Sequence, residues 1–150
     1  MSTELDPRPG RPLLRRSLNV LLAALLLGGL VYVVTGTDGE GTITPEETLR
    51  RMQAGDTAVV LLDVRTPSEY TGATGHLAGA LPLPLQELPA RMAELDVFRG
   101  KTLVVYCRTA NRSGQAAAQL REAGHTVLVM TGGITRWNAL DYPVVREEAR

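Results

Sequence analysis

The only cysteine of the chain, Cys107, stands between an apolar run and a short polar loop that contains two arginines. The run from Thr102 to Tyr106 is typical of a buried strand, and a helix is predicted to follow from Ser113 to Ala123. Backbone N–H groups in a loop that opens a helix favour a bound anion, as does the helix dipole. Such surroundings lower the pKa of a thiol and create a thiolate nucleophile. We therefore predict that Cys107 is a catalytic nucleophile and not a buried structural thiol.

The composition limits the kinds of partner and of chemistry. Sixteen Lys and Arg residues balance sixteen Asp and Glu residues in a chain of 150 residues, so we predict no nucleic-acid partner. One cysteine excludes an internal disulfide. The sequence also contains no His/Cys cluster with the spacing of metal ligands. We therefore predict neither a metal site nor a cofactor.

The N-terminal part of the chain predicts a membrane anchor. Residues 1–17 are rich in Pro and Arg and are expected to form a disordered basic tail. The next 17 residues, Leu18 to Val34, carry no charge, and we predict a short transmembrane helix over residues 18–35. Because four arginines precede this segment, the N-terminus is expected in the cytoplasm and the domain in the periplasm or outside the cell. A cleaved signal peptide is the main alternative, and a buried helix of the soluble domain is the least favoured one.

A linker, one domain and a short tail are predicted after the anchor. Residues 36–41 are rich in Gly and form the linker. The domain is expected over residues 42–145, and a polar tail over residues 146–150.

Strands and helices are predicted to alternate along this domain. Strands are expected at residues 58–64, 80–84, 102–106 and 126–130, and two prolines place the second of these at a sheet edge. Helices are expected at residues 45–54, 86–95 and 113–123, with short ones beginning at Thr66 and after Gly133. This alternation indicates a parallel sheet that is covered by helices on both faces, where ligands bind at the carboxyl ends of strands. Cys107 is predicted at one such end, and Asp63 and Arg65 at the end of a neighbouring strand.

Four segments of the domain resemble the rhodanese family of single-domain sulfurtransferases, in the order that the family has them. They are Leu62 to Tyr70, Gly75 to Ala80, Tyr106 to Ser113 and Gly132 to Trp137. The resemblance implies a five-stranded parallel sheet flanked by helices. It also implies a cysteine that takes up sulfur as a persulfide and passes it to a thiophilic acceptor. Related phosphatases of the same fold have five residues between the cysteine and the arginine of the loop, whereas four separate Cys107 from Arg112. The shorter loop favours transfer of a single sulfur over dephosphorylation.

The resemblance also implies roles for the loop. Its N–H groups would hold the persulfide, so the predicted substrate-binding residues are Arg108, Thr109, Ala110, Asn111 and Arg112. Ala110 stands where the family often has Gly. Arg108 is expected to point outward and attract an anionic donor, and Arg112 to face the loop or to pair with Glu69 or Asp63.

The remaining candidates are expected to have structural roles. Asp63 and Arg65 would support the loop from the neighbouring strand end. His76 resembles the histidine of a structural turn of the family. His125 follows a helix end and is expected on the surface, and Trp137 is expected in the core.

Together these inferences predict a membrane-anchored sulfurtransferase. Its donor would be thiosulfate or another source of sulfane sulfur, and its acceptor cyanide or the thiol of a small molecule or protein. No particular protein partner is predicted. A module of the same family that binds a partner without catalysis is the alternative from another class. A phosphatase or arsenate reductase of the same fold is the third possibility.

Overall fold

The computed structural model describes residues 41–146 of the chain. The predicted basic tail, the predicted anchor at residues 18–35 and nearly all of the predicted linker lie outside the described residues, as does most of the C-terminal tail. Among the helices formed by residues 41–146, none combines the length and the apolar character needed to cross a membrane.

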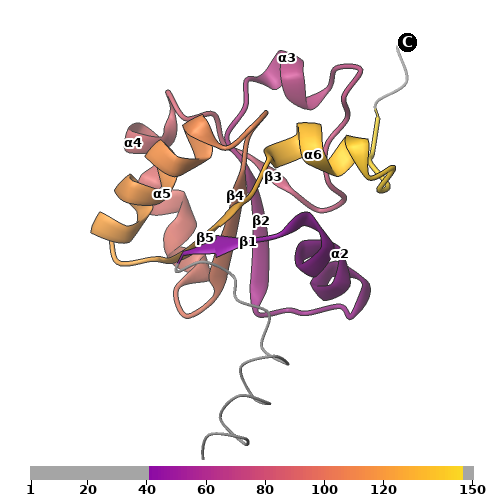
Figure 1. Ribbon diagram of the computed structural model, residues 1–150. Coiled ribbons are helices and arrows are strands. Elements are labelled where there is room, and N and C mark those ends of the chain that lie inside the picture. Colours follow the sequence, from indigo (N-terminus) through magenta and orange to yellow (C-terminus); the bar gives the residue numbers. More distant parts are fainter. Residues whose placement is uncertain (1–40, 147–150) are drawn as a thin grey trace, which may run out of the picture. The chain divides into compact units, whose positions relative to one another are not determined.

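Strands and helices alternate through the described part of the chain (Figure 1). The strands are β1 (Thr42–Ile43), β2 (Val59–Asp63), β3 (Leu81–Pro82), β4 (Thr102–Tyr106) and β5 (Thr126–Met130). The α-helices are α2 (Pro45–Gln53), α3 (Pro67–Tyr70), α4 (Leu88–Arg91), α5 (Asn111–Glu122) and α6 (Gly133–Ala139), and a 3-10 helix, η1 (Met92–Phe98), follows α4 directly.

These strands form one parallel sheet of five strands in the order β1-β5-β4-β2-β3. The three apolar runs of the sequence form its central strands, and the predicted parallel arrangement is confirmed. Strand β3 lies at an edge, as predicted, because Pro82 has no N–H group to donate to a further strand. Strand β1 has only two residues and no apolar run indicates it, so the resemblance alone implies the fifth strand.

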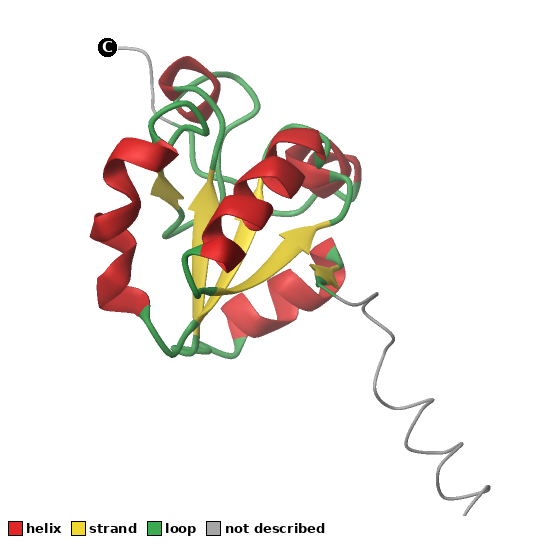
Figure 2. Cartoon of the chain, turned by 90° about the vertical axis from the view of Figure 1, so that its left-hand side faces the viewer, coloured by secondary structure: helices red, strands yellow, loops and turns green. Residues whose placement is uncertain are grey.

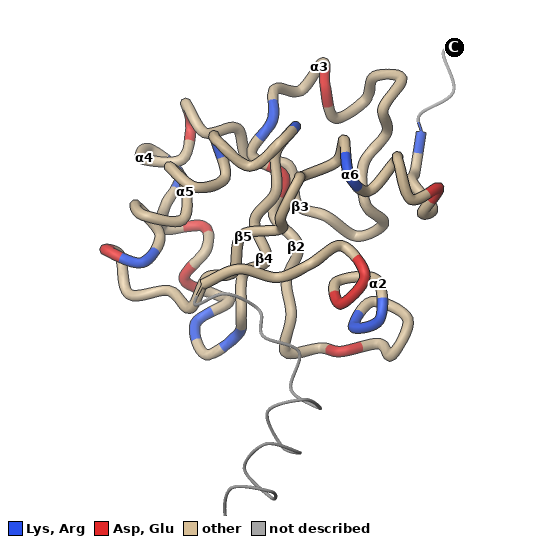
Figure 3. Tube along the Cα trace, viewed as in Figure 1, with Lys and Arg blue, Asp and Glu red and all other residues tan. Residues whose placement is uncertain are grey.

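Helices pack on both faces of the sheet (Figure 2). On one face, the small side chains of Ala116 and Ala117 in α5 join the core cluster that contains Leu103 of β4. On the other face, Val104 of β4 belongs to a cluster with the fully buried Trp137 of α6. Successive side chains of a strand point to opposite faces, which explains why β4 is apolar at every central position. Acidic and basic residues are interspersed along the trace (Figure 3).

The amphipathic segment predicted as a helix over residues 86–95 divides into two helices. Helix α4 has four residues, and η1 continues as a 3-10 helix to Phe98. A 3-10 helix has about three residues per turn, so side chains three positions apart share one face. Met92, Leu95 and Phe98 have this spacing, and all three pack against the same core cluster. The segment therefore does present one apolar face to the core, but with the three-residue period of a 3-10 helix.

The prediction that His125 lies on the surface is wrong, because its side chain is buried. Gly124, with φ of 87°, ends α5 and allows the chain to turn back toward η1. Nε2 of His125 lies 4.0 Å from a carboxylate oxygen of Asp96 in η1. Within residues 41–146, neither ring nitrogen makes a hydrogen bond. Helix η1 lies next to His125 although it comes well before it in the chain. The residues around His125 in the sequence therefore give no sign that the side chain is buried.

Candidate active site

Cys107 directly follows the central strand β4 and is 1% exposed. Helix α5 begins at Asn111, two residues earlier than the predicted start at Ser113. The connection between strand and helix is therefore only four residues long, from Cys107 to Ala110. This tight turn brings the first turn of α5 close to the sulfur.

Hydrogen bonds to the sulfur favour its thiolate form. Burial alone disfavours a charged thiolate. However, the hydroxyl of Ser113 lies 3.5 Å from Sγ of Cys107 and donates to it. The backbone N–H groups of Ser113, Thr109 and Ala110 donate as well. Together these donors outweigh the effect of burial, and the pKa of the Cys107 thiol lies below its usual value. The loop is thus a preorganised cradle for negative charge on sulfur.

Ser113 is a site residue that the sequence prediction omits. Its side chain is fully buried, and its hydroxyl also lies 3.0 Å from the carbonyl oxygen of Ala110. The residues that follow on the same face of α5 are Ala116, Ala117 and Leu120. One hydroxyl at the start of an otherwise apolar helix face is a signal that could have identified it, since buried hydroxyls require partners.

The start of α6 holds the loop through two backbone hydrogen bonds. The N–H of Ile134 donates to the carbonyl of Cys107 at 2.9 Å, and the N–H of Thr135 donates to the carbonyl of Arg108 at 3.1 Å. Gly133, with φ of 56°, makes this approach possible, because a Cβ atom there would overlap the carbonyl oxygen of Cys107. The glycine segment that contributes to the resemblance therefore positions the cysteine.

Arg112 pairs with Glu69, which is one of the two partners expected for it. Two guanidinium nitrogens of Arg112 each lie 2.7 Å from a carboxylate oxygen of Glu69. This pairing is the main reason that the pKa of Glu69 falls to about 2. Glu69 also accepts the N–H of Thr66 at 3.1 Å, in the capping box of α3. The ion pair therefore connects the first turn of α5 to the end of β2.

Asp63 and Arg65 form a buried ion pair after β2. The carboxylate of Asp63 accepts from Nη2 of Arg65 at 2.6 Å and from Nε at 2.9 Å. Arg65 also donates to the hydroxyl of Thr74 at 3.0 Å and to the carbonyl of Gly75 at 2.8 Å. The guanidinium thus ties the loop before β3 to the carboxyl end of β2, in keeping with the structural role expected for the pair.

Three of the predicted loop residues are exposed, namely Arg108, Thr109 and Asn111. Asn111 accepts a hydrogen bond from Gln115 at 2.8 Å. The side chain of Arg108 makes no hydrogen bond or ion pair with any residue in the described part of the chain. Its guanidinium is therefore a free positive charge on the residue that directly follows the cysteine.

His76 and Trp137 take the structural positions expected for them. The ring of His76 stacks on Tyr70 with a centroid separation of 3.7 Å, and its backbone pairs with Val145. The indole N–H of Trp137 donates to the carbonyl of Pro143 at 3.0 Å. Neither side chain is among the groups that donate to Sγ of Cys107.

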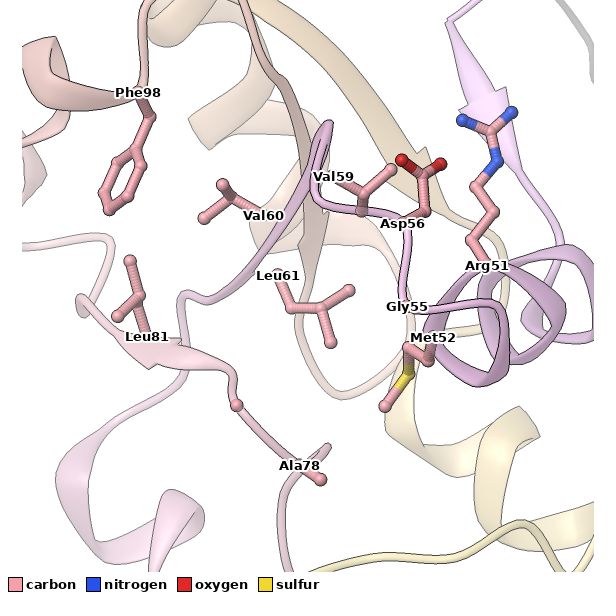
Figure 4. Close-up of a pocket in the computed structure, with 11 residues that line it drawn as sticks. Arg51, Met52, Gly55, Asp56, Val59, Val60, Leu61, Ala78, Leu81 and Phe98 are labelled. Carbon is pink, nitrogen blue, oxygen red and sulfur yellow. The ribbon is translucent and has the colours of Figure 1, made fainter.

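A cavity of about 440 Å³ lies away from Cys107 (Figure 4). It is lined by residues at the end of α2 and the start of β2, including Met52 and Val59, together with Leu81 and Phe98. Cys107 follows the carboxyl end of β4, and no residue of its loop lines this cavity. The size of a cavity therefore does not locate the reactive chemistry in this domain.

A parallel sheet that presents an activated cysteine in a tight anion cradle defines an α/β domain with thiolate chemistry. The sequence model for the rhodanese-like domain matches residues 44–140. The chain therefore belongs to the rhodanese-like domain family, as the four sequence segments indicated.

Several relatives match most of the domain. A protein of Allochromatium vinosum named sulfurtransferase is 39% identical over 103 residues, which are 68% of this chain and 92% of the relative. An uncharacterised protein of Synechocystis is 38% identical over 115 residues, or 76% of this chain, and the match spans only 61% of that relative. The thiosulfate sulfurtransferase PspE of Escherichia coli is 37% identical over 73 residues, which are 49% of this chain and 68% of the relative.

A solved structure of a rhodanese-related protein from Thermoplasma volcanium is also similar. Its TM-score is 0.63 at 31% sequence identity, with 71% of this chain and 98% of that chain covered. The likeness therefore extends over nearly the whole of that protein.

Ala110 adopts a backbone conformation that suits glycine, with φ of 146° and ψ of −10°. We expect Ala110→Gly to raise the free energy of unfolding by about 1 kcal/mol, because strain is released. Chemical denaturation monitored by circular dichroism measures this change. The control is Ala118→Gly at an exposed position inside α5, which should lower the free energy of unfolding by about 1 kcal/mol. Equal destabilisation by both variants would show that Ala110 is not strained.

Ser113→Ala should raise the pKa of Cys107, because the hydroxyl that stabilises the thiolate is removed. In the wild type the lowered pKa keeps Cys107 a thiolate down to a lower pH. In the variant the pKa is higher, so the thiolate should become protonated at a higher pH as the solution is acidified. Ultraviolet absorbance of the thiolate measures this titration, and Cys107→Ser supplies the baseline because the chain has no other cysteine. An unchanged midpoint would exclude the hydroxyl as a source of the shift.

Proposed function

We propose that the protein is a rhodanese-type sulfurtransferase in which Cys107 carries sulfane sulfur as a persulfide. The cradle around Sγ carries this proposal, because it lowers the pKa of the thiol and can hold the negative charge of an added sulfur. The short spacing of four residues between Cys107 and Arg112 also supports sulfur over phosphate as the group transferred. The names of the Allochromatium and Escherichia coli relatives agree with this choice.

In the proposed first half-reaction, the Cys107 thiolate attacks the sulfane sulfur of a donor such as thiosulfate. A bond forms between Sγ and the sulfane sulfur. The sulfur–sulfur bond of thiosulfate breaks, and its electron pair leaves with sulfite. The backbone N–H groups that face Sγ then stabilise the persulfide anion. In the second half-reaction, cyanide or a thiol removes the outer sulfur and regenerates the thiolate.

The five predicted binding residues divide into four groups in this mechanism. Thr109 and Ala110 act through their backbone N–H groups. Arg112 is occupied by Glu69 and holds the first turn of α5 in place. Arg108 supplies the free positive charge that attracts an anionic substrate. Asn111 begins α5 beside them, with its side chain on the exposed surface.

A module that binds a partner without catalysis is the second candidate. An intact cysteine with a lowered pKa is not needed for docking alone, so the site favours the enzyme. Phosphatase or arsenate reductase chemistry remains the third candidate, and the length of the loop disfavours it.

Incubation with thiosulfate should add one sulfur atom to the protein, because the Cys107 thiolate attacks the sulfane sulfur. Intact-protein mass spectrometry detects this gain, and Cys107→Ser should abolish it. Treatment of the loaded protein with cyanide should remove the sulfur and release thiocyanate. If no sulfane donor produces an adduct, the binding module becomes the better explanation of the fold.

We also propose that residues 18–35 anchor this domain to a membrane, with the domain in the periplasm or outside the cell. The uncharged apolar stretch and the arginines that precede it support this topology. A thiol in such a compartment would meet donors and acceptors other than those of the cytosol.

A reporter enzyme that folds only outside the cytoplasm, fused after Arg150, should be active when the full chain is produced in bacteria. The same fusion without residues 1–35 should be inactive, because nothing would direct it across the membrane. The full-length fusion should stay in the membrane fraction at its uncleaved mass, whereas a signal peptide would release a shorter soluble product. An inactive full-length fusion would contradict the predicted orientation.

A further inference from the structure

A second cavity, of about 360 Å³, lies beside the cysteine loop. It is lined by Arg108 of the loop, by Ile134, Thr135 and Asn138 of α6, and by Thr74 before β3, with Arg65 and Glu69 completing the wall. The lining therefore combines one residue of the cradle with residues that the sequence prediction did not single out for binding.

The cavity is joined to the cradle through the backbone. Ile134 and Thr135 belong to its wall, and their N–H groups donate to the carbonyls of Cys107 and Arg108. A molecule in the cavity would thus lie against the same α6 residues that fix the position of the cysteine. Arg108, which also lines the cavity, directly follows Cys107 in the loop.

The charges of the lining leave one positive charge without a partner. The guanidinium of Arg65 is neutralised by Asp63, and the carboxylate of Glu69 is neutralised by Arg112. Only Arg108, among the three charged residues of the wall, has no partner in the described part of the chain. The hydroxyl of Thr135 likewise makes no hydrogen bond there. A guanidinium and a free hydroxyl are suited to bind a carboxylate or a similar compact anion.

The size of the cavity points to an organic ligand. Its volume of about 360 Å³ lies within the range of roughly 300–1,000 Å³ that is typical of small-molecule sites. Thiosulfate or cyanide would leave most of this space empty. The donor and the smallest acceptor therefore do not fill the cavity, which also has room for an organic thiol whose carbon chain carries an anionic group.

We propose that this cavity binds the anionic end of a small organic thiol, which is the sulfur acceptor, through Arg108 and Thr135. The inference rests on the proposed function, because it names the acceptor of the Cys107 persulfide. Asn138 positions the wall, since its amide donates to the carbonyl of Thr74 at 3.1 Å.

In the transfer step, the acceptor sulfur forms a bond to the outer sulfur of the persulfide. The bond between Sγ of Cys107 and that outer sulfur breaks, and its electron pair stays on Sγ. The thiol proton passes to the transferred sulfur. A thiol and the persulfide anion thus become an organic hydropersulfide and the Cys107 thiolate, and no further oxidant or reductant is required.

The test uses the full-length protein after it has been loaded with sulfur and freed of donor. Sulfur release is timed with three thiols of equal carbon spacing: 3-mercaptopropionate, 2-mercaptoethanol and 2-aminoethanethiol. Each variant is compared with the wild type on the same thiol, so the intrinsic reactivity of the thiols cancels. Arg108→Gln should slow release to 3-mercaptopropionate about tenfold, as expected for the loss of a charge-assisted contact, and leave release to 2-mercaptoethanol nearly unchanged. Arg108→Glu should shift the preference toward 2-aminoethanethiol.

A second variant and a control complete the experiment. Thr135→Val should slow release to 3-mercaptopropionate about threefold through the loss of one hydrogen bond. Thr126→Val, an exposed position at the opposite end of β5, should change none of the rates. If the variants at Arg108 and Thr135 affect all three thiols equally, the acceptor site is overturned while the persulfide chemistry stands. If the wild type never acquires sulfur, the proposed function fails, and the acceptor site fails with it.

Discussion

A negative charge on a buried sulfur depends on the hydrogen bonds that reach it, and this dependence explains the arrangement around Cys107. At 1% exposure the residue has little access to bulk water, so the chain itself must supply the donors. The backbone does so because α5 begins immediately after Ala110, which places several N–H groups and the Ser113 hydroxyl around one atom. The unfavourable φ of Ala110 is the conformational cost of so short a connection.

Rigid elements on three sides maintain this arrangement. Strand β4 fixes the start of the loop, and the N–H of Ile134 in α6 holds the carbonyl of Cys107. The pairing of Arg112 with Glu69 restrains the far end of the loop. The loop follows β4, whereas α6 follows β5 and Glu69 lies in α3, which follows β2. The loop is therefore connected to segments that follow three neighbouring strands. The cradle is thus a product of the tertiary structure, although all of its donors to sulfur come from residues 109–113.

The sequence predicted the elements whose conformation depends on their own residues. Apolar runs placed β2, β4 and β5 because strands buried on both faces admit no polar position. It did not predict features that depend on how distant parts of the chain pack together. Strand β1 is too short to have a pattern, and His125 is buried by an element that lies well before it in the chain. Ser113 and the residues of the second cavity acquire their positions only when α5 and α6 meet the loop. The resemblance supplied the fifth strand, which periodicity could not.

The single thiol of the chain also determines its response to oxidants. A thiolate that is oxidised to a sulfenic acid is normally rescued when a nearby cysteine forms a disulfide with it. The chain has no second cysteine, so no such internal rescue exists for Cys107. An oxidised site must instead be recovered by a thiol from outside the chain, or it proceeds to the irreversible sulfinic acid. If thiols accept sulfur from Cys107 as proposed, the same thiols would also determine how long the site survives peroxide.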